Sequence, residues 1–344
     1  MYDYVIVTHL PAFYKVNLYN EIGKDSKIFV IFIAGETNEK RFSNFSKINK
    51  VNFDYIVINS GSFQKRSKFK SLIDVVKLLF SINYNKIIVS GWDLPEFWIT
   101  VLLSKYNKNC LALESTVLES NTNGIRGVVK KLFLSRVSTV FASGALHVQL
   151  LNKLAYSSSI KVTRGVGVIN KSTPTINHKS YNSQFIFIGR LVEVKNLELL
   201  ISVFNQLPNS SLTIVGEGEL ESTLRKKSNA NINFLHSIDN NKLNCLFNKY
   251  DFLILPSLAE PWGLVVEEAL YFGLPVIVSK QCGSSELIEN NVNGYIFDAH
   301  NGEQLKDIIN SVNVKSYSEL QNNIDESFIN NKDFLQVKAY EVKQ

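Results

Sequence analysis

Short apolar runs recur along the chain and alternate with longer stretches in which apolar residues have helical spacing. Each run carries few charges, which is typical of a strand buried on both faces of a sheet. The first half of the chain contains runs at 4–7, 28–33, 55–58, 86–89, 110–113 and 139–142. A second series follows at 185–188, 211–215, 232–235, 252–255, 275–278 and 294–297. This alternation predicts βαβ units and therefore two mainly parallel sheets.

A polar stretch rich in Asn, Ser and Pro separates the two series, between about residues 163 and 183. Because 344 residues suit two cores better than one, we expect a doubly wound α/β domain on each side of it. The expected boundaries are 1–165 for the N-terminal domain, 166–182 for the linker and 183–325 for the C-terminal domain. Residues 326–344 end in a helix-like pattern, which predicts a C-terminal helix, with packing back on the N-terminal domain as one option.

Cysteine usage and hydropathy narrow the class of protein. Cys110, Cys245 and Cys282 lie far apart, without paired spacing or a His cluster, so neither disulfides nor a zinc site is expected. The sequence has no run of about 18 uncharged apolar residues, so no segment is expected to span a bilayer. The N-terminus leads straight into an apolar run and lacks the pattern of a secretory signal. These features indicate a reduced, cytoplasmic protein.

Positive charge is concentrated in the N-terminal half. Residues 1–160 contain 20 Lys and Arg against 11 Asp and Glu, whereas residues 161–344 contain 17 against 20. The most basic segment, 64–70, leads into the apolar periodic stretch 72–80, a pattern that suits an anionic membrane surface. The alternative is a solvated basic turn before a helix packed on the core. Nucleic acid is not an expected partner, because the segment lacks interleaved aromatic residues and a binding motif.

Two glutamates stand where a strand-like run gives way to a helix-forming one. Glu260 follows the run at 252–255, and Glu268 lies eight positions further on. In a helix, eight residues would return Glu268 to within about 80° of Glu260. Two carboxylates on one wall, next to the backbone amides of a helix start, suit a polyhydroxylated ligand with an anionic group.

Further polar residues follow other runs of the second series. Gly189 and the cations Arg190 and Lys195 suit a diphosphate. The alternative is that these two cations pair with Glu193, Glu198 or Glu217. The Gly-x-Gly turn at 216–218 lacks the third glycine of a dinucleotide loop, so it suits the lining of a base or ribose better than NAD. Residues 283–286 fit a helix N-cap.

The order of these pieces resembles the C-terminal domain of retaining GT-B glycosyltransferases of family 4, also called glycosyl transferases group 1. The pieces are Gly-Arg-x4-Lys-Asn after a strand, Val-Gly-x-Gly, Glu-x2-Gly-Leu-x3-Glu-Ala, Gly-Leu-Pro-Val-Ile and Gly-x2-Glu-Leu-Ile-x5-Gly. The resemblance covers about residues 183–305, and the N-terminal half is similar to the bacterial surface-polysaccharide type. It implies two Rossmann-like domains facing a cleft, the N-terminal one for the acceptor and the C-terminal one for the nucleotide sugar.

The resemblance also implies a role for each matching residue. Arg190 and Lys195 would hold the donor diphosphate and offset the charge of the leaving group without a metal ion. Glu260, the third expected catalytic residue, would hold hydroxyls of the donor sugar, and Glu268 would hold the ribose. Glu267 would face away as a solvated helix residue. The other expected donor-binding residues are Gly189, Gly216, Glu217, His236, Pro261, Trp262, Gly263 and Leu264.

The N-terminal half supplies candidates for the acceptor or the cleft. Lys15 lies in a Gly-free Pro-x2-Tyr-Lys loop, similar to that of some bacterial polysaccharide transferases, and is expected near the donor phosphates or the acceptor. Glu114 follows a strand and is the leading candidate for orienting the acceptor hydroxyl, with a helix cap as the alternative. Trp92 and Asp93 offer an aromatic face and a carboxylate to a sugar. His9 and His147 rank lower as candidates for the cleft, because a lone His is more often structural than catalytic.

We therefore expect a retaining glycosyltransferase that moves a sugar from a nucleotide-diphosphate sugar to an acceptor hydroxyl. The expected setting is bacterial O-antigen or capsule synthesis on a lipid-linked glycan, in the cytoplasm or on the inner face of its membrane. No cofactor or metal is expected besides the nucleotide-sugar co-substrate. One alternative is an inactive relative that acts as a partner or nucleotide-binding protein. Another, an oxidoreductase or epimerase, would need an N-terminal Gly-x-Gly-x2-Gly loop or a cleft histidine.

Overall fold

The computed structural model describes residues 1–38, 45–46, 48, 50–174 and 179–341. The chain forms two compact units, Met1–Val168 with Asp333–Gln344 (unit 1) and Ile169–Lys332 (unit 2). Each unit has one parallel sheet with crossover helices, so the expected pair of doubly wound α/β domains is confirmed. Most of the expected linker, 166–182, belongs to unit 2, and its residues 175–178 lie outside the described part of the chain.

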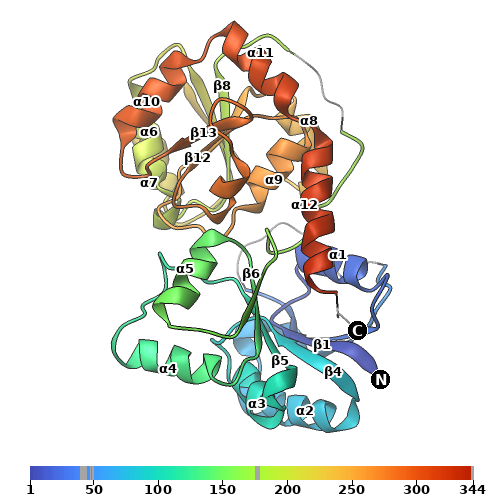
Figure 1. Cartoon of the computed structure of the whole chain (residues 1–344). Coiled ribbons are helices and arrows are strands. Elements are labelled where there is room, and N and C mark those ends of the chain that lie inside the picture. The colour runs from blue at the N-terminus through green and yellow to red at the C-terminus, as the bar shows by residue number, and fades with distance from the viewer. Residues whose placement is uncertain (39–44, 47, 49, 175–178, 342–344) are drawn as a thin grey trace. The chain divides into compact units, whose positions relative to one another are not determined.

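Unit 1 contains a sheet in the order β3-β2-β1-β4-β5-β6-β7 (Figure 1). Its strands are β1 (Tyr2–Thr8), β2 (Ile28–Glu36), β3 (Asp54–Ser62), β4 (Tyr84–Val89), β5 (Asn109–Leu113), β6 (Thr139–Ala142) and β7 (Ser159–Val162). Its helices are α1 (Phe13–Ile22), α2 (Lys68–Ser81), α3 (Pro95–Leu103), α4 (Gly124–Leu134) and α5 (Ala145–Lys153), with short 3₁₀ turns η1 (Phe63–Lys65) and η2 (Tyr106–Lys108). One core packs α2, α3, α4 and α5 on the sheet, and a second core packs α1 on it.

Unit 2 contains a sheet in the order β10-β9-β8-β11-β12-β13. Its strands are β8 (Gln184–Ile188), β9 (Ser211–Val215), β10 (Ile232–Leu235), β11 (Phe252–Leu255), β12 (Val276–Ser279) and β13 (Gly294–Phe297). Its helices are α6 (Leu197–Asn205), α7 (Glu221–Lys227), α8 (Leu243–Phe247), α9 (Leu264–Tyr271), α10 (Gly302–Ser311) and α11 (Val314–Asn323). Its 3₁₀ turns are η3 (Glu193–Lys195), η4 (Asn240–Lys242) and η5 (Gly283–Leu287).

Helix α12 (Glu326–Ala339) begins in unit 2 and ends in unit 1. After its last turn, the ring of Tyr340 stacks on Phe141 with centroids 4.3 Å apart, and Tyr4 donates a hydrogen bond of 2.7 Å to the Tyr340 carbonyl. Tyr340 therefore belongs to the core that also holds α1. Residues 342–344, which the sequence assigns to the same C-terminal segment, lie outside the described part. Among the described residues, no helix has the length and apolar character that crossing a membrane requires.

All twelve apolar runs predicted as strands form strands. The sequence does not predict β7, because its residues Ser-Ile-Lys-Val are half exposed at the sheet edge and form no apolar run. It does not predict α11 either, since residues 314–323 are mostly polar. A capping box starts this helix: the Asn313 side chain accepts from the Ser316 N–H, and the Ser316 side chain accepts from the Asn313 N–H.

The carboxyl ends of the strands position the polar candidates. The strand order reverses between β1 and β4 in unit 1 and between β8 and β11 in unit 2. Loops at such a reversal leave the sheet toward opposite faces, and doubly wound proteins bind ligands between them. Lys15 and Asp93 follow β1 and β4, whereas Lys195 and Glu260 follow β8 and β11.

Candidate functional site

The loop after β8 brings two of the expected site residues into contact. Lys195, which ends the turn η3, forms an ion pair through Nζ with Glu260 Oε2. Their side chains are 12% and 17% exposed, so the pair is partly shielded from solvent. The expected structural alternative does not hold for this lysine, whose partner is Glu260 rather than Glu193, Glu198 or Glu217.

Glu260 lies in a loop between β11 and α9 that is tied to the neighbouring strand end. Its N–H donates to the Gln281 carbonyl at 3.2 Å, and its carbonyl accepts from the Gly283 N–H at 2.9 Å. Helix α9 starts only after Gly263, whose φ of 98° lies in the left-handed region. A Cβ on Gly263 would also lie 2.8 Å from Leu255 Cδ2, so this bend requires glycine.

The prediction that Glu260 and Glu268 lie on nearly the same face of one helix is wrong. Glu260 precedes α9, and only Glu268 lies within it. Glu268 is buried, and Asn240 donates a hydrogen bond to its Oε1. Asn170 in turn donates to Asn240 Oδ1 at 3.1 Å. Burial raises the pKa of Glu268 to about 8, against the hydrogen bond from Asn240. The sequence does not single out Asn240, which orients this carboxyl.

The raised pKa of Glu268 predicts that its contribution to stability declines as the pH rises. The unfolded carboxyl ionises near its usual pKa of 4.5 and the folded one near 8, so between these values the folded state holds an extra proton. The stabilisation by Glu268 is complete below the unfolded pKa of 4.5 and is lost as the pH rises to the folded pKa of about 8. The free energy of unfolding falls by at most about 1.4 kcal/mol per pH unit over this range. Burial lowers the pKa of His147 from its usual value of 6.5 to about 4. Above pH 6.5, His147 is therefore neutral in both the folded and the unfolded state and does not change the free energy of unfolding with pH.

The measurement is urea unfolding at about pH 7 and about pH 8, for the wild type and for Glu268→Gln, which keeps a neutral side chain. We expect the unfolding midpoint of the wild type to fall between the two pH values and that of the variant to stay level. An equal fall in both proteins would mean that another group causes the pH dependence.

Glu267 is not solvated, so the expectation for this residue is wrong. It is fully buried, it accepts a hydrogen bond from Trp262 Nε1, and its Oε2 lies 2.8 Å from Lys332 Nζ. Lys332 is itself buried on α12. The pair ties the loop around Trp262 to the C-terminal helix. No local spacing signals this contact, since the partners lie 65 positions apart in the chain.

The loop after β12 does not form the expected helix cap. Residues 283–287 form the 3₁₀ turn η5, and no side chain caps it. Ser284 is buried, and its Oγ has no hydrogen-bond partner among the described residues. A Cβ on Gly263 would lie 3.0 Å from this hydroxyl, so Ser284 adjoins the loop of Glu260. A buried, unpaired hydroxyl there is a further candidate for binding a polar ligand group.

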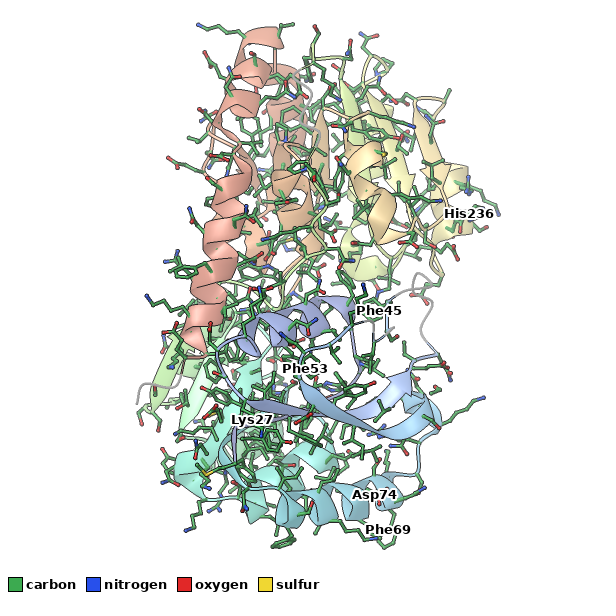
Figure 2. The ribbon with its side chains drawn as sticks, turned by 90° about the vertical axis from the view of Figure 1, so that its right-hand side faces the viewer. Lys27, Phe45, Phe53, Phe69, Asp74 and His236 are labelled. Carbon is green, nitrogen blue, oxygen red and sulfur yellow. The ribbon has the colours of Figure 1, made fainter. Side chains whose placement is uncertain are left out.

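The glycine turn after β9 serves packing. A Cβ on Gly216 would lie 1.9 Å from the Gly189 carbonyl oxygen, so the loops after β8 and β9 touch backbone to backbone. Beside this contact, Glu217 accepts from Ser237 Oγ at 3.0 Å and lies 3.9 Å from His236 Nδ1. The His236 side chain is 83% exposed and points away from unit 2 (Figure 2). Three of the expected donor-binding residues thus lie close together, namely Gly216, Glu217 and His236.

The acceptor candidates of unit 1 form two close pairs. Lys15 Nζ lies 2.7 Å from Glu114 Oε1, and His9 Nε2 lies 2.9 Å from Asp93 Oδ2. Burial by itself lowers the pKa of Lys15, but the charge of Glu114, with smaller contributions from Tyr14 and Tyr19, outweighs burial, and the pKa is raised. Burial raises the pKa of Asp93, but the hydrogen bond from His9, the charge interaction with His9 and smaller contributions together outweigh burial, and the pKa is lowered. Lys15 and Asp93 therefore keep their charges near neutral pH.

A cavity of about 240 Å³ in unit 1 is lined by both members of the Lys15–Glu114 pair and by His9 of the second pair. Its lining includes His9, Tyr14, Lys15, Phe45, Phe63 and Glu114. Charged groups beside aromatic rings suit a sugar, which offers both hydroxyls and an apolar face. Trp92 is not among the lining residues; its carbonyl accepts from Trp98 Nε1 at 2.9 Å, and Lys130 lies 5.6 Å above its ring. His147 is buried, in line with its low rank.

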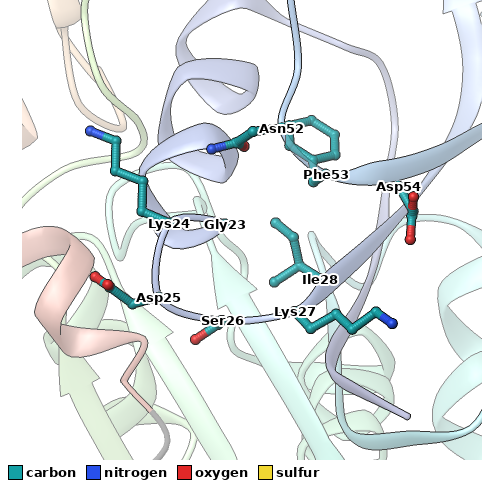
Figure 3. Close-up of a pocket in the computed structure, with 9 residues that line it drawn as sticks. All are labelled: Gly23, Lys24, Asp25, Ser26, Lys27, Ile28, Asn52, Phe53 and Asp54. Carbon is teal, nitrogen blue, oxygen red and sulfur yellow. The ribbon is translucent and has the colours of Figure 1, made fainter.

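A larger hollow of about 410 Å³ lies where β2 and β3 begin (Figure 3). It is lined by residues 23–28 and 52–54. Two of its charged side chains are engaged at its rim: Lys24 lies 2.7 Å from Glu21, and Lys27 lies 5.1 Å above the ring of Tyr2. This hollow lies at the amino ends of the strands, whereas doubly wound sheets bind ligands at the carboxyl ends. We therefore place the functional site at the carboxyl ends of the strands and not in this hollow.

Two doubly wound units with these strand orders define the GT-B fold. Sucrose-phosphate synthase from Thermosynechococcus elongatus has the same fold, with a TM-score of 0.74 and 15% identity, over 98% of this chain and 97% of that one. The apo form of the lipopolysaccharide outer core galactosyltransferase WaaB has a TM-score of 0.71 and 14% identity, over 98% of both chains. At these identities the likeness shows the fold alone.

Residues 169–329, which form nearly all of unit 2, match the family described as Glycosyl transferases group 1. The O-antigen biosynthesis glycosyltransferase WbnH of Escherichia coli is 37% identical over 120 residues, which are 34% of this chain and 35% of that protein. The first curated relatives are matched over about a third of their own length, 36% and 35%. The expected GT-B fold is thus confirmed, and the family match is confined to unit 2.

Proposed function

We propose that the protein is a glycosyltransferase that moves a sugar from a nucleotide-diphosphate sugar to an acceptor hydroxyl with retention of configuration. The observation that carries this proposal is the contact between Lys195 and Glu260 at the carboxyl ends of β8 and β11. A shielded ammonium beside a carboxylate suits the diphosphate and the sugar hydroxyls of one donor. The family match over unit 2 supports the same activity.

In the proposed reaction, Arg190 and Lys195 bind the diphosphate and stabilise its growing negative charge as the bond to the anomeric carbon breaks. Glu260 accepts hydrogen bonds from the sugar, and Glu268 accepts them from the ribose. The acceptor hydroxyl attacks the same face that the diphosphate leaves, and its proton passes to the leaving phosphate. This route needs neither a protein base nor a bound metal ion.

For the acceptor, we propose the 240 Å³ cavity of unit 1, with Lys15 and Glu114 orienting the attacking hydroxyl. The proposed setting is bacterial surface polysaccharide synthesis on a lipid-linked glycan. Its support is the relative WbnH, whose name assigns that protein to O-antigen biosynthesis. The proposed location is the cytoplasm, with peripheral contact to the inner face of its membrane.

A thermal-shift screen with UDP, GDP and dTDP tests the donor site, since a ligand at 100 times its Kd stabilises the folded state by about 2.7 kcal/mol. Glu268→Gln should weaken nucleoside diphosphate binding at neutral pH by about 0.5 to 1.5 kcal/mol, because the Glu268 carboxyl is then mostly protonated and a hydrogen bond between neutral groups is lost. Glu260→Ala should spare this binding and suppress sugar transfer. Isothermal titration and a transfer assay measure the two effects.

Each result has a distinct meaning. If none of the nucleoside diphosphates bound, the proposal would be rejected. Nucleoside diphosphate binding without donor hydrolysis or transfer would favour the inactive relative. If NMR showed an inverted anomeric configuration in the product, the retaining mechanism would be wrong, but the proposed sugar transfer would stand.

A further inference from the structure

Helix α4 carries large apolar side chains on its outer face. The exposed fractions are 84%, 65%, 44% and 59% for Ile125, Val128, Val129 and Leu132. Spacings of three, four and seven residues place these four side chains within an arc of about 100° on the helix surface. The side toward the core is formed by Gly127, Phe133 and Leu134, which are buried. The helix therefore has a second apolar stripe that the described residues leave exposed.

Positive charge borders this stripe. Helix α4 contains Arg126, Lys130 and Lys131 and has neither Asp nor Glu. Lys130 is engaged with unit 1, because it donates to the Asn121 carbonyl at 2.8 Å, whereas Arg126 and Lys131 are exposed. An aliphatic stripe flanked by Lys and Arg is the arrangement of helices that lie in the plane of an anionic membrane surface.

Helices α2 and α3 pack against each other and into the same core as α4. They add exposed apolar side chains, and Phe69 on α2, 75% exposed, points away from unit 1 (Figure 2). In the basic segment 64–70, Lys65, Lys68 and Lys70 are exposed, whereas Arg66 is not. Arg66 is held by buried Glu96 at 3.0 Å, so this cation serves the structure of unit 1.

We propose that the outer face of α4 binds an anionic lipid bilayer. Ile125, Val128, Val129 and Leu132 enter the boundary between headgroups and acyl chains, and Arg126 and Lys131 lie against the lipid phosphates. A second copy of this chain fits less well, because a two-fold contact would bring the same basic residues together. The inference deepens the proposed peripheral location and does not depend on the proposed sugar transfer.

Flotation of the full chain with lipid vesicles tests the inference. The wild type should float with an equal mixture of phosphatidylcholine and phosphatidylglycerol, and not with phosphatidylcholine alone. Replacing both Ile125 and Leu132 with Gln should lower the partition coefficient at least about tenfold, because less apolar surface leaves water. Replacing both Arg126 and Lys131 with Gln should lower it roughly fivefold per charge, and this loss should shrink at high salt.

A matched control lies on α11, where Val314 is 62% exposed and Lys315 stands next to it. Replacing both with Gln should leave flotation unchanged. Equal flotation of all variants, or no flotation of the wild type with anionic vesicles, would overturn the inference. So would a dimer in sedimentation equilibrium that the Ile125 and Leu132 variant dissociates, since the stripe would then bind a second copy.

Nucleoside diphosphate binding, measured on the same variants, keeps the two proposals apart. The α4 variants should bind the nucleotide as the wild type does, and Trp92 and Trp98 fluorescence in urea unfolding checks that unit 1 is folded. If the wild type floated with anionic vesicles and bound none of the nucleotides, only the proposed function would fail. If it bound a nucleotide and did not float, only the membrane surface would fail.

Discussion

Replacing Lys195 with methionine is expected to lower kcat for sugar transfer by roughly 100- to 1,000-fold, the range for removing one preorganised group that stabilises transition-state charge. The ammonium is shielded by the loops after β8 and β11 and already contacts Glu260. In such a setting, charge is worth more than in water, and its effect grows as the diphosphate leaves. Methionine keeps the length and the apolar stem of the side chain and removes the charge.

The measurement is steady-state transfer or donor hydrolysis with the nucleotide sugar whose base the screen identifies. Lys226→Met, an exposed lysine on α7 of the same unit, is the matched control and should have the activity of the wild type. A higher KM with unchanged kcat would mean that Lys195 binds the donor equally in the ground state and the transition state. Its role in stabilising the leaving group would then be wrong.

The ion pair adds a complication that a second variant resolves. Without Lys195, the Glu260 carboxylate loses its counterion, and this change alone can disturb the loop. Replacing Lys195 with methionine and Glu260 with glutamine together removes both charges. If the lysine acts on the diphosphate, the double variant should be as slow as the single one. If the single variant only misplaces Glu260, the double variant should recover part of the rate.

The sheets could be predicted from the sequence because parallel strands are mostly buried on both faces and therefore read as continuous apolar runs. That signal is local, and it is absent where a strand is short and half exposed at an edge, as β7 is. The sequence leaves open, as one option, that the C-terminal helix packs on the N-terminal domain, and the place of Tyr340 in the core of unit 1 agrees with that option. Which sheet the end of α12 packs on depends on contacts with distant residues such as Phe141 and Tyr4.

The candidate site was predicted in part for the same reason. Strand ends are local signals, so Gly189, Lys195 and Glu260 could be assigned to one edge of a sheet. Their partners are not local, and the lysine and glutamate that meet lie 65 positions apart. Glu267 shows the limit most clearly, because a charged residue in a helix is usually solvated. Here α12 brings Lys332 to that face and buries the carboxylate.

Lys332→Met is expected to destabilise unit 2 by about 3 to 5 kcal/mol, the cost of leaving a buried charge without its counterion. Glu267 is fully buried, and the ammonium of Lys332 lies 2.8 Å from its Oε2. The loop that carries Trp262 should loosen as well, since Trp262 Nε1 donates to the same carboxylate. Donor binding should therefore weaken along with stability.

A double variant separates charge from packing. Replacing Lys332 with methionine and Glu267 with glutamine removes both charges and leaves the Gln amide oxygen as an acceptor for Trp262. Because a neutral pair avoids the desolvation cost, most of the stability lost in Lys332→Met should return. Trp262 is the one tryptophan of unit 2, so its fluorescence, with Trp92 and Trp98 replaced by Phe, follows urea unfolding of that unit. The control variant Lys226→Met should have the stability of the wild type. If the single and double variants lost equal stability, the effect would come from packing of α12 and not from the ion pair.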